Sequence, residues 1–113
     1  MKKIVFEINN IGAPYRFVGD FEINDNILSF NDEETLYEVH LNKRKIIRRN
    51  GEYTTEIDFD KEHIKLGFLG KETDIKINVL EYGKQGFDLF VKYKLEEEEI
   101  EVKARVEDQD EFN

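Results

Sequence analysis

Residues 45–57, with the sequence KIIRRNGEYTTEI, decide the fold class of this chain. Apolar and β-branched residues alternate with polar ones on both sides of Asn50-Gly51, and this period of two is typical of half-buried strands. Asn-Gly is the dipeptide best suited to a two-residue turn whose twist matches that of the flanking strands. The stretch therefore predicts an antiparallel β-hairpin with Asn50 and Gly51 at its tip.

The same alternation recurs along the rest of the chain and predicts about ten strands. Asn24-Asp25-Asn26 suits a turn, because these residues adopt positive φ and bond their own backbone. Residues 82–86 are interpreted as another turn, and Gly19 suits a tight bend where a curved sheet turns a corner. No segment has a convincing helical period. The predicted strands comprise residues 4–8, 15–23, 27–30, 35–41, 45–49, 53–59, 64–68, 75–79, 87–95 and 100–106.

Strands at this spacing are expected to form a single antiparallel meander. An open meander leaves two exposed edge strands, and closure into a barrel removes them. The sequence therefore predicts an all-β fold, closed into a barrel of about 8–10 strands. We expect one domain over residues 1–106, followed by an acidic, frayed tail over residues 107–113.

The composition argues against several classes of protein. The 113 residues are 39% hydrophobic and contain no apolar run long enough to cross a membrane. A net charge of −9 disfavours general binding to nucleic acid, because that affinity comes largely from cations. With no cysteine, the chain forms neither disulfides nor thiolate metal sites. We therefore expect a cytoplasmic protein that binds neither membranes nor nucleic acid.

Three stretches and one single residue, Phe59, carry a resemblance to a known family; the stretches are residues 21–30 (FEINDNILSF), 46–51 (IIRRNG) and 89–95 (LFVKYKL). Arg49 and Gly51 match the family pattern of two apolar residues, Arg, any residue and Gly, and Tyr93 matches a late Tyr-any-Leu strand. From residue 21 to residue 106 the chain is thus similar to the YwiB-like family of small bacterial proteins. The chain departs from the pattern at Arg48, where the family usually has an apolar residue, and at Phe30, where it tends to have tyrosine. The resemblance implies a calycin-type (lipocalin-like) β-barrel and supplies no reaction.

The hairpin also carries the most distinctive charge cluster of the chain, with five basic residues between positions 43 and 49. In the predicted turn Arg49 lies across from Glu52 and Lys45 lies across from Glu56, which are stabilising pairs. Arg48 shares the inward face, where a guanidinium is costly unless an acceptor meets it. Arg48, or Arg49 if the turn is bulged, is therefore a candidate for binding an anionic ligand at a barrel mouth. The simpler and favoured interpretation is that this arginine extends to solvent or pairs within the protein.

Inward tyrosines are the second candidate feature. The interior of a barrel of about eight strands is either plugged by side chains or holds one small ligand. With this many aromatic residues a mostly filled interior is favoured, with the phenol hydroxyls near the mouths or bonded internally. The candidate ligand-binding residues are Arg48, Arg49, Tyr37, Tyr53 and Tyr93.

No constellation in the sequence predicts a catalytic site, a metal site or a cofactor. The two histidines, His40 and His63, lack the spacing of metal ligands. We expect a non-enzymatic protein that binds a small ligand at a barrel mouth or a protein partner on its outer sheet. The alternative is an enzyme acting on a small anionic molecule in the barrel, with Arg48, Arg49 and a tyrosine providing electrostatic stabilisation.

Several apolar residues point outward in the predicted strands, although no helix is expected to cover them. Contiguous apolar patches of this kind usually mark an interface. We therefore expect at least weak self-association as a two-fold homodimer. The outward apolar residues are Val5, Val18, Leu36, Ile47, Leu69, Leu80 and Phe90.

Overall fold

The computed structural model of the chain describes residues 1–10 and 14–108. These residues form twelve β-strands and no helix, so they include no helix of the length and hydropathy needed to span a membrane. The all-β prediction is confirmed. The strands are β1 (Lys2–Asn9), β2 (Tyr15–Gly19), β3 (Glu22–Asn24), β4 (Ile27–Asp32), β5 (Thr35–His40), β6 (Lys45–Asn50), β7 (Tyr53–Asp58), β8 (His63–Phe68), β9 (Lys71–Lys76), β10 (Asn78–Gln85), β11 (Asp88–Leu95) and β12 (Glu98–Asp108).

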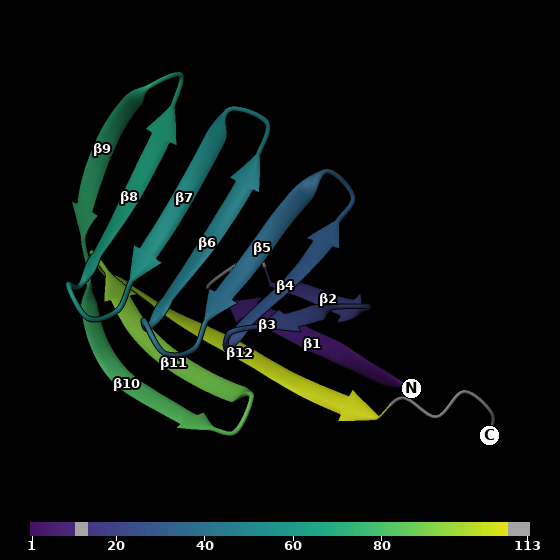
Figure 1. Cartoon of the computed structure of the whole chain (residues 1–113). Coiled ribbons are helices and arrows are strands. Elements are labelled where there is room, and N and C mark those ends of the chain that lie inside the picture. Colours follow the sequence, from purple (N-terminus) through teal and green to yellow (C-terminus); the bar gives the residue numbers. More distant parts are fainter. Residues whose placement is uncertain (11–13, 109–113) are drawn as a thin grey trace.

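The strands form two antiparallel sheets (Figure 1). Sheet A has five strands in the order β10-β11-β12-β1-β2, and sheet B has seven strands in the order β3-β4-β5-β6-β7-β8-β9. The chain passes between the sheets twice, from β2 to β3 through Asp20 and Phe21, and from β9 to β10 through Ile77. The turns that join β4 to β5, β6 to β7 and β8 to β9 lie in a row at one end of the strands of sheet B, the end away from sheet A (Figure 1).

The prediction of one closed barrel is not confirmed, because neither sheet closes on itself within the described residues. The predicted strands 15–23 and 75–79 each divide at a passage between the sheets. The alternation of apolar residues in the sequence continues through both passages, because Phe21 and Ile77 pack in or against the core although they lie between strands. Gly19 ends β2 at the first passage, where the predicted bend occurs, and a Cβ at this position would lie 2.6 Å from the ring of Phe17.

Two further boundaries differ from the prediction. Strand β10 continues through Tyr82 to Gln85, and its turn follows at Gly86 and Phe87. Strand β12 continues to Asp108, which pairs with Lys2, so the first two residues of the predicted tail belong to sheet A. The remainder of that tail, residues 109–113, lies outside the described residues.

Strands β4 to β9 are three copies of an 18-residue hairpin unit, which cover residues 25–42, 43–60 and 61–78. In each unit the second and ninth residues have positive φ, and the strands begin at the third and eleventh residues. The seventeenth residue is apolar and buried, and its backbone N–H donates a hydrogen bond to the carbonyl of the second residue. These bonds join Leu41 to Asn26 (3.0 Å), Phe59 to Arg44 (2.9 Å) and Ile77 to Glu62 (3.1 Å).

The predicted hairpin joins β6 to β7, but its two-residue turn lies one residue later in the sequence than predicted, so each β6 residue pairs with a residue two positions further along β7. Asn50 pairs with Tyr53, which leaves Gly51 and Glu52 as the turn, and Gly51 has a φ of 60° that suits glycine. Because side chains alternate with a period of two, this change of partner by two residues leaves every side chain on its predicted face of the sheet, and Arg48 lies on the inner face as predicted. The predicted pairs with Glu52 and Glu56 are replaced by Arg49 opposite Thr54 and Lys45 opposite Asp58, while Lys45 Nζ reaches Glu56 diagonally at 3.3 Å.

The inner faces of the two sheets enclose one apolar core, which includes Phe6, Leu28, Val39 and Val91. Two residues on the outer faces, Val5 and Ile47, are nevertheless only 0% and 8% exposed. Each has long charged residues beside it on neighbouring strands, whose aliphatic stems cover apolar surface. These neighbours are Arg105 for Val5, and Glu38 and Glu56 for Ile47.

Candidate functional site

Sheet A covers only part of the inner face of sheet B. Paired residues of successive strands form rows across that face, and the row nearest the core is apolar. The next two rows lie progressively closer to the hairpin turns and are here called the middle row and the rim row. The middle row consists of Phe30, Tyr37, Arg48, Thr55, Leu66 and Thr73, and the rim row of Asp32, Thr35, Asn50, Tyr53, Phe68 and Lys71.

Aromatic residues of β1 and β2 cover the middle row in the first hairpin unit. Phe30 and Tyr37 are 2% and 6% exposed. The ring of Phe6 lies 5.3 Å from both of their rings, and the ring of Phe17 stacks on Phe30 at 4.7 Å. These separations are in the range of favourable aromatic pairs. In the first unit, therefore, the middle row belongs to the core.

Equivalent positions of the second and third units line a hollow of about 370 Å³, here called the open hollow. At its rim the rings of Tyr53 and Phe68 stack with centroids 4.3 Å apart and an interplanar angle of 19°. The two residues are still 57% and 40% exposed. A concave surface with aromatic and a few polar side chains is typical of small-molecule sites. The lining residues are Arg48, Tyr53, Thr54, Thr55, Leu66, Gly67, Phe68, Lys71 and Thr73.

A series of side chains orients Arg48 where the open hollow meets the first unit. Arg48 Nε donates a hydrogen bond to Tyr37 Oη at 3.3 Å, and the guanidinium carbon lies 5.9 Å from the centre of the Tyr37 ring. That ring stacks on Tyr15 at 5.8 Å, and Tyr15 Oη donates to Asp32 Oδ2 at 2.6 Å. Burial raises the pKa of Tyr15, and its hydrogen bonds to Asp32 and Tyr37 raise the pKa further. Tyr15 therefore remains a neutral hydrogen-bond donor at neutral pH.

Within the described residues, Arg48 forms no ion pair, whereas every other arginine lies within 3.4 Å of a carboxylate. The lining of the open hollow includes a second cation, Lys71, and no aspartate or glutamate. This lining contrasts with the whole chain, which has 26 acidic and 17 basic residues. The open hollow is thus a positively charged site on an acidic protein. The other arginine pairs are Arg16 with Glu7, Arg44 with Asp60, Arg49 with Glu38, and Arg105 with Glu7.

The structure brings some of the five predicted site residues together and separates the others. Arg48 and Tyr53 line the open hollow, and Tyr37 contacts Arg48 from the covered side. Arg49 lies on the outer face of sheet B, where its Nη1 is 3.3 Å from Glu38 Oε2. Tyr93 is buried in the covered part of the core, where burial raises its pKa to about 12.

Sequence reasoning did not select the other residues of the open hollow. Thr55, Leu66 and Thr73 belong to the middle row, and Phe68 and Lys71 belong to the rim row. The signal that identifies them is the 18-residue repeat, because Thr55 and Thr73 occupy the unit position of Tyr37. A scan of the sequence for internal repeats would have grouped these positions.

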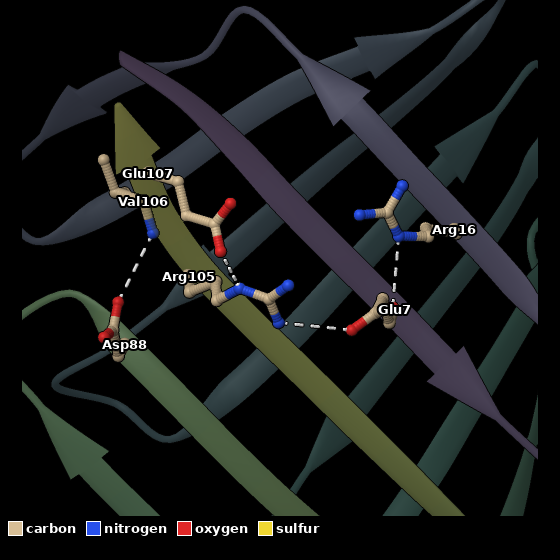
Figure 2. Close-up of polar contacts among 6 residues, drawn as sticks. All are labelled: Glu7, Arg16, Asp88, Arg105, Val106 and Glu107. Atoms are coloured by element: carbon tan, nitrogen blue, oxygen red, sulfur yellow. Dashed lines mark hydrogen bonds and ion pairs between the residues drawn. The ribbon is translucent and has the colours of Figure 1, made fainter. Parts of the chain in front are cut away.

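A larger hollow, of about 490 Å³, lies on the outer face of sheet A and includes Arg105 in its lining. Figure 2 shows that this arginine is already paired: its Nη1 lies 3.3 Å from Glu7 Oε1, and its Nε donates to Glu107. Glu7 also accepts a hydrogen bond from Arg16 Nε at 3.2 Å (Figure 2). These contacts tie β1, β2 and β12 together across the sheet. Arg105 is therefore less available to a ligand than Arg48 is, and the larger hollow differs from the open hollow in having Asp88 in its lining beside Lys84 and Lys103.

The comparisons with known proteins add no family and no relative: no protein-family model, no curated protein and no solved structure matches this chain.

Proposed function

We propose that the protein is a non-enzymatic binding protein that takes a small organic molecule into the open hollow. The observation that carries this proposal is that equivalent positions of the hairpin units differ in their exposure to solvent. In the first unit Phe30, which lies under β1 and β2, and Thr35 are only 2% and 9% exposed. Their counterparts on the same inner face of the third and second units, Leu66 and Tyr53, are 38% and 57% exposed. A ligand that packs there would bury apolar surface that the protein itself leaves in water.

Two finer proposals accompany this function. We infer that the two sheets are an opened variant of the calycin-type barrel and that the chain belongs with the YwiB-like bacterial proteins. The support is topological, because β2 continues into β3 and β9 continues into β10, so the meander runs around both sheets and returns to β1 through β12. We also infer a cytoplasmic location, which is supported by a composition with no cysteine.

The alternative functions have less support from the geometry. An enzyme that uses both arginines at one centre is disfavoured, because Arg48 and Arg49 lie on opposite faces of β6. Docking of a protein on an outer apolar patch is also disfavoured, since the exposed residues are scattered: Val18 and Leu80 lie on opposite edge strands of sheet A, and Leu69 lies in the turn between β8 and β9 of sheet B. Self-association as a homodimer remains a prediction.

The test of the proposed function uses a neutral fluorescent probe, N-phenyl-1-naphthylamine, and two tryptophan variants of the exposed edge strand β9. Thr73→Trp places an indole in the open hollow, whereas Glu72→Trp places the same indole on the opposite face of the strand. We expect saturable binding to the native protein and to Glu72→Trp, and at least about tenfold weaker binding to Thr73→Trp. Equal affinity for all three proteins, or no binding to the native protein, would contradict the proposal.

Native mass spectrometry provides a second measurement. We expect protein purified from its own host to retain a small molecule that adds a discrete mass, and we expect Thr73→Trp purified in the same way to lose that mass. Retention of the same molecule by Thr73→Trp would place it elsewhere in the protein.

A further inference from the structure

We propose that the ligand of the open hollow is a planar molecule with an oxyanion, and that Arg48 binds the oxyanion while Tyr53 and Phe68 contact the planar part. This inference rests on the proposed function and adds the chemical class of the ligand. The oxyanion is a carboxylate or a phosphate, both of which a guanidinium binds through paired N–H groups.

The first argument concerns the hydrogen-bonding capacity of Arg48. A guanidinium has five N–H donors, and the hydrogen bond to Tyr37 uses only the one on Nε. Arg48 is half-buried, and no described carboxylate pairs with its terminal nitrogens. Removing a charged group from water is costly unless a hydrogen-bond acceptor meets it. An anionic ligand would supply such an acceptor to the terminal nitrogens of Arg48.

The second argument concerns orientation. Because Tyr37 accepts from Nε and stacks on Tyr15, the Arg48 side chain is held from the covered side of the middle row. Tyr15 is in turn fixed by its 2.6 Å hydrogen bond to Asp32. An arginine that is held in this way loses less conformational freedom on binding, so more of the interaction contributes to affinity.

The third argument concerns the surroundings of the oxyanion. Thr55 is paired with Arg48, and Thr73 lies two strands further along the same row, so both threonines line the hollow together with Arg48. Lys71 adds a second positive charge at the rim. On a chain with a net charge of −9, this local positive potential selects anions at this place and not over the surface in general.

The fourth argument concerns the rest of the ligand. The stacked rings of Tyr53 and Phe68 form a flat aromatic surface next to the cations, with a centroid separation of 4.3 Å. Aromatic surfaces favour flat partners through stacking and buried area. A molecule with an oxyanion at one end and a ring system at the other fits both parts of the hollow.

The experiment compares two probes that share a ring system and differ in charge. The probes are 8-anilinonaphthalene-1-sulfonate, whose sulfonate represents the oxyanion, and neutral N-phenyl-1-naphthylamine. Arg48→Met removes the proposed receptor, and Arg49→Met removes the neighbouring arginine, which lies on the outer face. We expect Arg48→Met to weaken the sulfonate probe at least about tenfold and Arg49→Met to change it less than about twofold. Arg49→Met should leave the affinity of the neutral probe unchanged, and the loss caused by Arg48→Met should be smaller for the neutral probe than for the sulfonate probe.

The outcomes separate the two proposals. If the native protein binds the neutral probe but Arg48→Met binds the sulfonate probe as tightly as the native protein does, the oxyanion site is wrong and the proposed function stands. If the native protein binds neither probe, both proposals fail. Competition by 1-naphthoate and by 1-naphthyl phosphate then distinguishes a carboxylate ligand from a phosphate ligand. Amide chemical shifts of Thr55 and Thr73, which should move with either competitor, place the binding in the open hollow.

Discussion

Replacing Gly51 with alanine should lower the free energy of unfolding by about 1 kcal/mol. Gly51 has a φ of 60°, and the left-handed conformation costs a residue with a Cβ roughly 1–2 kcal/mol. The unfolded chain gains order when glycine becomes alanine, which offsets about 0.5–1 kcal/mol of this cost. A Cβ at Gly51 would meet no atom within 4 Å, so no collision adds to the effect. The expected loss is therefore due to backbone conformation alone.

The hairpin repeat provides the opposite substitution at the equivalent position. Glu33 is the ninth residue of the first unit, as Gly51 is of the second, and it has a φ of 57° with an exposed side chain. Glu33→Gly relieves the same conformational cost and should raise the free energy of unfolding by about 0.5–1 kcal/mol. The two variants together therefore form a matched pair with effects of opposite sign.

Urea denaturation monitored by circular dichroism measures both changes, and equal m-values would show that the denatured states are comparable. At the expected magnitudes the melting temperature should fall by roughly 4 °C for Gly51→Ala and rise by a smaller amount for Glu33→Gly. The reasoning would be refuted if Gly51→Ala were neutral, or if both substitutions shifted stability in the same direction.

Three other predictions concern burial and assembly. Tyr93 has a pKa of about 12 in the folded protein against about 10 when unfolded, so its contribution to stability should be constant well below pH 10 and fall by up to about 3 kcal/mol as the pH rises to 12. Urea titrations at pH 9, 10 and 11 should show a shallower decline for Tyr93→Phe, and an unchanged decline would contradict this. Phe6→Ala should destabilise the protein by about 3–5 kcal/mol, since Phe6 is fully buried against three aromatic rings; a loss below 1 kcal/mol by urea denaturation would disprove the packing. Light scattering should give twice the 13.5 kDa mass if the predicted homodimer forms, and a monomer at high concentration would count against it.

The sequence pattern predicted faces well and boundaries less well. Period-two alternation placed Phe6, Ile57 and Val91 on the inner face, and all three pack in or against the core. The same pattern did not reveal that the chain leaves one sheet for the other near Phe21 and Ile77, because a residue that turns a corner can still point inward. Closure of a barrel depends on hydrogen bonds between distant strands, and alternation within a strand carries no information about them.

Prediction of the candidate site was limited for a related reason. Alternation shows the face of a strand on which a side chain lies, but not which end of that face a second sheet covers. Arg48 and Tyr93 were both predicted to be inward, yet Arg48 borders the open hollow and Tyr93 lies deep in the covered core. Arg49 was included as the ligand-binding arginine of a bulged turn and as a partner of Arg48 in the enzyme alternative, and the observed two-residue turn places it on the outer face.

The 18-residue period of sheet B makes its width adjustable in discrete steps. Each hairpin unit closes its own base, as in the hydrogen bond from Phe59 to Arg44, and joins its neighbours through the same strand positions. A further copy of residues 43–60 inserted after Asp60 would add two strands without altering the junction at either side. Such duplication would enlarge the concave face of sheet B by one hairpin unit, so the width of this sheet can change only in steps of two strands and 18 residues.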